Sequence, residues 1–592
     1  MMRTHTNNDL RKTDINKKAT VCGWVDTRRD HGGIIFIDLR DRYGLTQIVF
    51  DPEFDKKTHA EASKLHREDV IQVSGTIKER LVGMKNPNLA TGDIEVFASK
   101  LTILNASEIP PMEVDDRKAP NESTRLRYRY LDLRRPSMQK KLIMRHTAAQ
   151  ATRAYFTENN FIEIETPLLL KHTPEGARDY IVPSRVHPGK VYSLPQSPQL
   201  YKQTLMISGF DRYFQLARCL RDEDLREDRQ PEFTQIDIEM SFVEEDDIMA
   251  ICEGLIKTIW KKAANKDLKT PFPRMSYDEA VGKYGIDRPD LRFRLQLVDV
   301  TNTVKDSDFK VFCDVVQKGG IVKCINAEKA NFTRTQIEEY IEFAKKHGAA
   351  GMAWMKVTDG KLDSNIVKFF SEKIQKQLIQ ETNAKDGDII FFVAEKSKVC
   401  NDVLYRVRLK LGEDLKLINH NEQYFVWVVD FPMFDYNDEE KRWDAMHHPF
   451  TSPKPEHMQY LSKDPSKVKA RAYDLVLNGI EIGGGSIRIN TPQVQHQVLG
   501  MLGYSIKEAE EKFGFLLEAL KYGAPPHGGL AFGFDRICAL LAGTHDIREV
   551  IAFPKTKAAE NPMDGSPSPI SDKNLKELNL ELNAVAKKNL WK

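Results

Sequence analysis

The chain has 592 residues and a mass of 67.9 kDa, so we predict about three or four domains. Hydrophobic residues make up 41% and charged residues 29%, which excludes a disordered or fibrous chain. The 88 Lys and Arg against 86 Asp and Glu leave a net charge of +2. That balance excludes a histone-like polycation, but a local basic surface could still bind nucleic acid.

Targeting and redox features point to the cytoplasm. No apolar run approaches the roughly 18 residues of a membrane helix, and residues 1–18 lack the apolar segment of a secretory signal. The seven cysteines are scattered and form no CxxC pair, so we expect neither a disulfide framework nor a cysteine-rich zinc site. We therefore expect a soluble cytoplasmic protein.

Residues 20–104 have the pattern of a small all-β unit. Apolar residues alternate with polar ones around 35–40, 71–77 and 94–96, and glycines separate these runs. Short bent strands with glycine corners predict a five-stranded closed barrel, of which the OB-fold is the commonest form. Its exposed face would usually carry an oligonucleotide, although another kind of interaction module is also compatible with the pattern.

The composition and the predicted secondary structure then change several times along the chain. Residues 108–136 are Pro-rich and then charged, which predicts a hinge, and a helix follows from Ser137 to Asn159-Asn160. Strands and helices mix up to about 290. Residues 291–414, with Lys-rich helices, one of them at 335–345, and two compact strands, one of them around 389–393, predict an inserted α+β domain. Apolar strands return up to 555, and 556–592 form a polar tail with a short helix.

The strand ending near Phe242 combines an apolar and a polar face. Ile236, Ile238, Met240 and Phe242 share one face, and Gln235, Asp237 and Glu239 share the other. A solvated sheet face alone could explain this alternation. However, a dense charged loop at 221–229 precedes the strand and predicts a hairpin tip over its polar face, where an arginine could bind a phosphate with two hydrogen bonds.

Two glycine-rich stretches have similar features. Glu481 and Arg488 flank three consecutive glycines at 483–485, which indicate a close approach of backbone or ligand, or a bulge. Residues 527–543 lead from glycines into Asp535-Arg536 and an apolar helix; an arginine at a helix start opposes the helix dipole unless an anion lies there too. No GxxxxGK[ST] occurs, which excludes a P-loop.

Three stretches resemble motifs 1, 2 and 3 of class II aminoacyl-tRNA synthetases: FIEIETP at 161–167, the hairpin at 214–239, and GLAFGFDR at 529–536. Five further stretches, HTPEGARDY, LPQSPQLYKQ, AMHHPFTSP, EIGGGSIRI and RYRYLDLRRP, resemble the bacterial type of aspartyl-tRNA synthetase. GAAGMAW at 348–354 lies in a block similar to the domain that bacterial aspartyl enzymes insert into the catalytic domain. The resemblance extends over nearly the whole chain.

The resemblance implies a multidomain fold. It has an N-terminal OB-fold barrel, a class II antiparallel α+β catalytic domain with six to seven strands, and an inserted α+β domain. It also implies a homodimer whose interface includes motif 1, where Pro167, which lacks an N–H, suits a strand end facing a partner. The boundaries that follow are 1–107 for the anticodon-binding domain, 108–136 for the hinge, 137–290 and 415–555 for the catalytic domain, 291–414 for the insertion, and 556–592 for the C-terminal extension.

The implied reaction has two steps: aspartate and ATP give aspartyl-adenylate, and the aspartyl group then passes to tRNA. It needs no protein nucleophile, so orientation and charge neutralisation carry catalysis. The resemblance implies that Arg221 and Arg536 are catalytic, on the α- and γ-phosphates, and that Phe233 stacks on adenine. The full implied ATP site is Arg221, Asp222, Glu223, Gln230, Phe233, Glu481, Gly533, Phe534, Asp535 and Arg536.

Aspartate and magnesium sites are implied in the same way. Mg²⁺ needs hard oxygen ligands, and the implied pair is Asp474 and Glu481. Lys202 and Arg488 match the pair that binds the side-chain carboxylate of aspartate, and two cations there would reject the neutral amide of asparagine. The implied aspartate site is Glu175, Ser197, Gln199, Lys202, Arg221, Asp237, His447 and Arg488, with His448 beside His447 at its lip.

The barrel carries the implied tRNA contacts. Arg29, Phe36 and Gln47 match anticodon-contacting positions, because an aromatic ring can stack on a splayed base and polar groups can bind its edge. His31 and Gly83 resemble the non-discriminating subtype, which charges both tRNA(Asp) and tRNA(Asn) and needs a tRNA-dependent amidotransferase in the same cell. Both could also be ordinary turn residues.

Other functions stay open. The first alternative is a strictly tRNA(Asp)-specific aspartyl-tRNA synthetase. A second is a non-catalytic tRNA-binding paralogue, which would have lost motif arginines or metal carboxylates; this chain keeps Arg221, Arg536, Asp474 and Glu481. A third is a free-standing amino-acid ligase such as asparagine synthetase, which lacks an anticodon barrel.

Overall fold

The computed structural model describes residues 1–118, 120–173 and 176–589. Residues Met1–Ile143 and Arg548–Ser568 form one unit, and Met144–Ile547 with the chain from Pro569 onward form a second. In the described parts of the chain, no helix is both long enough and apolar enough to cross a membrane.

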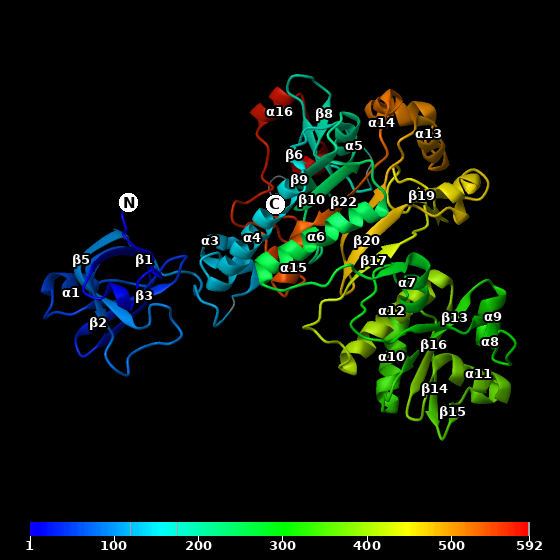
Figure 1. Cartoon of the computed structure of the whole chain (residues 1–592), viewed down its shortest axis with the longest axis horizontal. Coiled ribbons are helices and arrows are strands. Elements are labelled where there is room, and N and C mark those ends of the chain that lie inside the picture. The colour runs from blue at the N-terminus through cyan, green and yellow to red at the C-terminus, as the bar shows by residue number, and fades with distance from the viewer. Residues whose placement is uncertain (119, 174–175, 590–592) are drawn as a thin grey trace. The chain divides into compact units, whose positions relative to one another are not determined.

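The first unit contains a closed five-stranded barrel, shown in blue in Figure 1. The predicted alternation is confirmed, because Ile35, Ile37 and Leu39 are buried in the barrel core while Phe36 is only half-buried on the outer face. The strands pair in the order β1-β2-β3-β5-β4, and their bounds are β1 (Lys18–His31), β2 (Ile34–Arg40), β3 (Leu45–Phe50), β4 (Val70–Glu79) and β5 (Ile94–Asn105), with α1 (Lys56–Ala62) between β3 and β4 and η1 (Lys12–Asp14) before β1.

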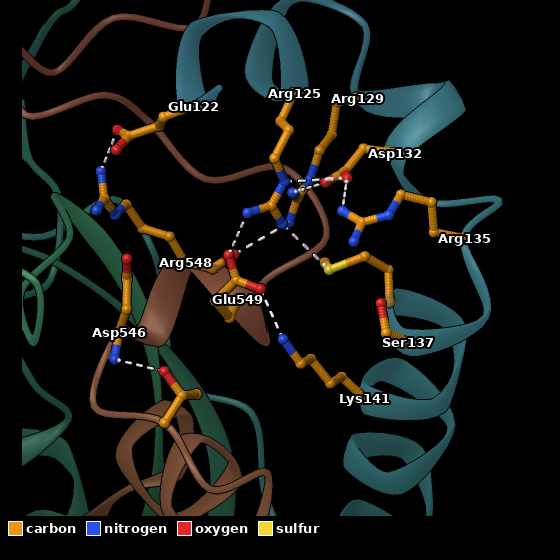
Figure 2. A network of polar contacts seen from close by, with 12 residues as sticks. Glu122, Arg125, Arg129, Asp132, Arg135, Ser137, Lys141, Asp546, Arg548 and Glu549 are labelled. Carbon is orange, nitrogen blue, oxygen red and sulfur yellow. Dashed lines mark hydrogen bonds and ion pairs between the residues drawn. The ribbon is translucent and has the colours of Figure 1, made fainter. Parts of the chain in front are cut away.

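The segment predicted as a hinge contains two short helices, α2 (Glu122–Arg127) and α3 (Arg129–Asp132). Figure 2 shows contacts between these helices and η6 (Ile547–Glu549), and the same helices also bind the residues that follow η6. Arg125 pairs with Asp132 at 3.0 Å and with Glu549 at 2.7 Å, and Lys141 pairs with the other oxygen of Glu549 at 2.6 Å. Arg129 donates hydrogen bonds to the backbone carbonyls of residues 548, 551 and 552. Side chains therefore tie two distant stretches of sequence together.

An eight-stranded sheet forms the centre of the second unit, in the order β11-β17-β20-β21-β22-β10-β9-β6. The six middle strands pair antiparallel, while the short edge strands β11 and β6 pair parallel, which accounts for the excess over the six to seven strands expected. The strands are β6 (Ile162–Glu163), β9 (Arg212–Leu220), β10 (Glu232–Ser241), β11 (Arg274–Ser276), β17 (Phe425–Val429), β20 (Ala472–Leu477), β21 (Ile480–Ile487) and β22 (His527–Gly533).

Strand β10 has the two faces that the sequence predicts, with one exception. Ile236, Ile238 and Met240 are at most 2% exposed. Phe242 does not continue this face: the strand ends at Ser241, and Phe242 has a φ of +58° and is 72% exposed. Its placement on the apolar face was wrong, because the chain turns before the alternation is complete.

A second, five-stranded sheet lies within residues 291–414, where the sequence predicted two strands (Figure 1). The two shortest strands, of three residues each, are too short to show a clear alternation. The strand predicted around 389–393 is β16 (Ile389–Glu395), and its continuous apolar run is buried on both faces, with Phe391 and Phe392 in separate apolar clusters. The predicted helix is α10 (Arg334–Lys346). The sheet order is β12-β13-β16-β14-β15, with β12 (Leu297–Asp299), β13 (Ile321–Ala327), β14 (Ala353–Thr358) and β15 (Lys361–Asp363).

Helices and short hairpins complete the two units. The predicted helix from Ser137 is confirmed as α4 (Pro136–Glu158), and the polar tail holds two helices where one was expected. The other helices are α5 (Gln199–Ile207), α6 (Glu245–Ala264), α7 (Tyr277–Tyr284), α8 (Thr301–Val304), α9 (Lys310–Gln317), α11 (Glu372–Thr382), α12 (Ser397–Asp414), α13 (Pro492–Met501), α14 (Ile506–Ala519), α15 (Phe534–Leu541), α16 (Asp572–Leu578) and α17 (Ala584–Asn589). The two hairpins pair β7 (Ile181–Pro183) with β8 (Val191–Ser193), and β18 (Phe434–Asn437) with β19 (Arg442–Ala445).

Candidate active site

A cavity of about 510 Å³ lies in the second unit, lined by residues of β10, β21 and β22 and by the loop between β9 and β10. Its volume is that of a typical small-molecule site. The loop is the tip of a β9–β10 hairpin, as predicted from the charged run. The predicted site residues that line the cavity are Ser197, Gln199, Lys202, Arg221, Glu223, Gln230, Phe233, Asp237, His447, His448, Asp474, Glu481, Arg488, Gly533, Asp535 and Arg536.

Glycines in β21 and β22 keep room for this site. A Cβ on Gly485 would come within 2.1 Å of the Gly529 carbonyl oxygen, and one on Gly484 would come within 2.4 Å of Asp474 Oδ1. Both distances are shorter than any real Cβ contact, so side chains at these positions would push the strands or the carboxylate aside. The three glycines of 483–485 thus mark close approaches of backbone and carboxylate. The pairing of β21 with β20 also shifts its register next to Gly483, so the bulge that was the other explanation expected from the sequence is present too.

Buried charges of alternating sign lie at one end of the cavity. Lys202 Nζ is 2.6 Å from Asp237 Oδ1 and 3.3 Å from Glu239 Oε2, and Arg488 Nε is 2.9 Å from Glu239 Oε1. All four side chains are at most 2% exposed. Burial raises the pKa of Asp237, whereas Arg488 and Lys202 outweigh burial and lower the pKa of Glu239. Glu239 was absent from the predicted site, although its place on the polar face of β10 pointed to it.

The histidine pair beside this cluster is held neutral. Burial and the nearby Arg488 charge lower the pKa of His447 to about 4, and they place the pKa of His448 well below its ordinary value. Arg488 Nη1 faces Nε2 of His448, and the Phe450 backbone N–H faces its Nδ1. A protonated ring would carry a hydrogen on both nitrogens and would set each of them against a donor, so the neutral ring is favoured. Neutral rings leave Lys202 and Arg488 as the cations facing this end of the cavity.

Arginines and an aromatic ring gather near the hairpin. The Arg221 guanidinium lies 5.1 Å from the centre of the Phe233 ring. Arg536 pairs with Asp228 at 3.2 Å and donates to the Glu481 carbonyl oxygen, while Glu223 pairs with Arg229. The cavity therefore has two arginines suited to phosphate oxygens, with a ring suited to stacking beside one of them.

Asp474 and Glu481 form an acidic pair on the same wall. Asp474 Oδ1 is buried and accepts no hydrogen bond from the described residues, and His447 Nδ1 lies 3.9 Å from it. Burial and the neighbouring Glu481 raise the pKa of Asp474 well above its ordinary value. Oxygen donors with an unsatisfied buried atom fit a hard divalent cation. Among the described residues no group of three or more His, Cys, Asp or Glu side chains could hold a metal.

Asp535 is engaged by protein groups, a role that the sequence did not indicate. Its carboxylate accepts from the Thr234 backbone N–H at 2.7 Å and from Arg145 Nη1 at 2.5 Å. Arg145 comes from α4, and its guanidinium also lies 4.7 Å from the Phe534 ring centre. Three elements far apart in sequence, α4, β10 and α15, therefore meet at this carboxylate next to Arg536. Only the fold brings Arg145 here.

Three predicted residues are not part of the cavity lining. Asp222 is exposed and its backbone N–H donates to the Arg178 carbonyl oxygen. Phe534 is 2% exposed and packs in the protein interior. Glu175 lies outside the described residues.

The barrel presents the predicted anticodon residues on neighbouring strands. Arg29 lies opposite Phe36 across β1 and β2, and Gln47 on β3 lies opposite Asp38 of β2. Arg29 pairs with Asp38 at 2.9 Å. Gln47 donates to Glu95, whose pKa is raised by burial. Aromatic and polar groups on one outer face are the combination that single-stranded nucleic acid requires.

Sequence comparison decides the family. Residues 121–557 match the family model described as tRNA synthetases class II (D, K and N), and residues 19–104 match that of an OB-fold nucleic acid binding domain. The chain belongs to the class II tRNA synthetase family. The predicted fold class, a multidomain chain with an OB-fold barrel and a class II catalytic domain, is confirmed.

Relatives in this family cover almost the whole chain. The Aspartate–tRNA(Asp/Asn) ligase of Desulfatibacillum aliphaticivorans is 53% identical over 584 residues, with 98% of each chain covered. The Aspartate–tRNA ligase of Ruminiclostridium cellulolyticum is 50% identical over 582 residues, again with 98% of each covered. Among solved structures, asparaginyl-tRNA synthetase from Pyrococcus horikoshii complexed with asparaginyl-adenylate has a TM-score of 0.59 and 20% identity, covering 94% of this chain and 99% of that one. This last similarity shows the fold.

Proposed function

We propose that this synthetase is an aspartate–tRNA(Asp/Asn) ligase: it activates L-aspartate with ATP and transfers the aspartyl group to tRNA(Asp) and tRNA(Asn). The names of the relatives support this activity. The observation that carries it is the pairing of Lys202 and Arg488 in one cavity with the hairpin arginine Arg221. Two buried cations suit a substrate with a side-chain carboxylate, and the nearby arginine suits a phosphate.

ATP would occupy the hairpin side of the cavity. Arg221 would bind the α-phosphate, Arg536 would bind the γ-phosphate once it releases Asp228, and Phe233 would stack on adenine. As the substrate carboxylate attacks the α-phosphorus, charge builds up on the phosphate oxygens, and fixed guanidinium groups stabilise it without reorganisation. Glu223, Gln230, Glu481, Gly533 and Asp535 complete the proposed site. Asp222 and Phe534, which do not line the cavity, would support it without touching ATP.

Aspartate would occupy the buried end. Its side-chain carboxylate would take the place of Asp237 and Glu239 as a partner of Lys202 and would bind Arg488. Its ammonium would face oxygen atoms of Ser197, Gln199 and Asp237. Asparagine would present a neutral amide to Lys202 and Arg488 and would lose the charge-assisted hydrogen bonds that the carboxylate of aspartate can make. We assign His447 and Glu175 to the same substrate.

Mg²⁺ would be held by Asp474 and Glu481 together with phosphate oxygens. When bound, it would supply positive charge that neutralises the triphosphate. The buried, unbonded Oδ1 of Asp474 supports this assignment.

The larger organisation follows from the same proposal. Residues 1–107 would bind the anticodon through Arg29, Phe36 and Gln47, 108–136 would be the hinge, and 137–290 with 415–555 would form the catalytic domain. Residues 291–414 would be the inserted domain and 556–592 the C-terminal extension. The enzyme would work in the cytoplasm as a homodimer with motif 1 at its interface, alongside a tRNA-dependent amidotransferase that converts Asp-tRNA(Asn).

Two barrel positions bear on the choice of tRNA. His31 is exposed at the end of β1, with its ring centre 6.2 Å from that of Phe36, and Gly83 has a φ of +89° in an exposed loop. A larger residue at 83 would strain this backbone, so the loop shape depends on glycine. The imidazole of His31 lies beside Phe36, the proposed stacking residue, and can both donate and accept hydrogen bonds. Together with the small Gly83, it would allow either base at the third anticodon position to bind. Strict tRNA(Asp) specificity is the alternative.

Pyrophosphate exchange with each of the twenty amino acids tests the activity, and we expect aspartate to be the preferred substrate. Exchange with asparagine or lysine but not aspartate would refute the proposal, and no exchange at all would favour a non-catalytic paralogue. Charging tRNA(Asp) and tRNA(Asn) transcripts side by side tests the second part. A preference for tRNA(Asp) of about a hundredfold, or ~3 kcal/mol, would establish the strictly specific enzyme.

A further inference from the structure

A line of hydrogen bonds leads from the backbone before β22, through two buried side chains, to the cavity. His527 Nδ1 lies 2.7 Å from the Pro525 carbonyl oxygen, and His527 Nε2 lies 3.1 Å from Gln203 Nε2. Gln203 Oε1 accepts from Gln199 Nε2 at 3.0 Å. His527 and Gln203 are completely buried, whereas Gln199, one turn earlier on α5, lines the cavity. We call these three side chains the relay.

The chemistry of the first acceptor fixes the direction of every bond in the relay. A backbone carbonyl can only accept, so His527 Nδ1 carries the hydrogen. Burial lowers the pKa of His527, which keeps the ring neutral near pH 7 and leaves a lone pair on Nε2. Gln203 must therefore turn its NH₂ group to His527 and its oxygen to Gln199. The oxygen and nitrogen of an amide have similar shapes, so it is the hydrogen-bond network that determines which way each glutamine amide is turned.

The consequence appears at the cavity. Gln199 must turn its NH₂ group to Gln203, and its Oε1 has no hydrogen-bond partner among the described residues. An amide oxygen in this position can only accept, so it suits a ligand that carries an N–H donor. The nearby carboxylate of Asp237, whose Oδ2 is buried without a partner among the described residues, favours a cationic donor in the same place.

We propose that Gln203 and His527 are positioning residues that orient the Gln199 amide so that its oxygen accepts a hydrogen bond from the substrate ammonium group. This inference rests on the proposed function, because it takes aspartate as the ligand. Without the relay, the amide can rotate by 180° and present its NH₂ group to the ammonium, where two donors repel each other. Burying the two polar side chains of Gln203 and His527 is costly unless they are paired, so apolar residues would serve a purely structural role better.

The test is Gln203→Met in the full-length enzyme, which keeps the side-chain length and removes both polar ends. In aspartate-dependent pyrophosphate exchange we expect the KM for aspartate to rise about tenfold, or 1.4 kcal/mol, with the KM for ATP unchanged. Succinate, which is aspartate without its amino group, should inhibit both enzymes with equal affinity. Loss of packing alone would weaken succinate and aspartate to the same extent, and that result would overturn the proposal.

Two further variants isolate the relay. His527→Asn keeps a donor near Pro525 but withdraws the acceptor from Gln203, and it should raise the aspartate KM by a smaller factor. In a Gln199→Met background, Gln203→Met should have no additional effect on the aspartate KM; additive effects would contradict action through Gln199. Gln423→Met is the matched control, because Gln423 accepts from the buried Trp260 indole N–H and does not line the cavity. It should leave both KM values unchanged.

These experiments distinguish a failure of the proposed function from a failure of the proposed role of the relay. If the wild-type enzyme shows no aspartate-dependent exchange, the proposed function fails. If the wild-type enzyme is active and Gln203→Met matches it, only the relay fails. A Gln203→Met or His527→Asn protein that does not fold would also count against positioning, because that role predicts a folded enzyme with a selective loss.

Discussion

Glu549 lies at the centre of the network in Figure 2, and its replacement by glutamine tests the energetic role of that network. Its carboxylate pairs with Arg125 and with Lys141, and its side chain is 21% exposed. Burial would raise the pKa of Glu549, but the hydrogen bonds from these two cations outweigh it and lower the pKa from 4.5 to about 2. Glu549→Gln removes the charge and leaves two cations without their shared partner.

The size and the pH window of the effect follow from linkage. A pKa that falls from 4.5 to about 2 on folding corresponds to about 3 kcal/mol of stability. A lowered carboxyl pKa stabilises the fold above the unfolded value of 4.5, and this contribution disappears as the pH falls toward 2. Glu549→Gln should therefore destabilise this unit by up to about 3 kcal/mol at pH 7, with a smaller difference from wild type below pH 4.5.

Hydrogen exchange resolved along α2 and α3 is the suitable assay, because it reports on this unit without assuming that the whole chain unfolds in one step. We expect exchange there to accelerate by up to about a hundredfold at pH 7. Glu79→Gln, which breaks an exposed pair with Lys85 in the same unit, should leave exchange unchanged. Equal exchange in wild type and Glu549→Gln, or a difference that grows on acidification, would refute the reasoning.

Three further predictions concern the reaction. Arg221→Ala should reduce pyrophosphate exchange by about a hundredfold or more with an unchanged melting temperature, and near-normal exchange would remove it from the phosphate site. Phe36→Ala should raise the KM for tRNA and leave exchange unaffected; an unchanged charging rate would exclude it from anticodon binding. Arg145→Gln should raise the KM for ATP, because Asp535 beside Arg536 loses a partner, whereas Arg153→Gln on the same helix should not. Equal effects of these two variants would show that only helix stability matters.

The local pattern of residue types in the sequence was enough to predict several strands and many residues of the candidate site. The period-2 alternation of the barrel strands and of β10 predicted which side chains are buried, because neighbouring residues of a strand point to opposite faces whatever surrounds them. The charged run predicted the hairpin, and the resemblance to class II motifs pointed to residues of one cavity that come from segments as distant as Ser197 and Arg536. The prediction that Phe242 is buried on the apolar face of β10 was wrong, because alternation does not show where a strand ends.

Only the tertiary structure decided which of these groups face each other. His527 and Gln203 are 324 residues apart, and although each lies in a stretch that the sequence marks, nothing in either stretch shows that the two side chains meet. Likewise, Arg145 reaches Asp535 across 390 residues, and Glu549 joins Arg125 across 424. The direction of a hydrogen bond, the partner of a buried charge and the shift of a pKa depend on neighbours supplied by remote segments. Residue types along the chain specify what each group can donate or accept, and the packing of the sheet and helices determines which partner it has.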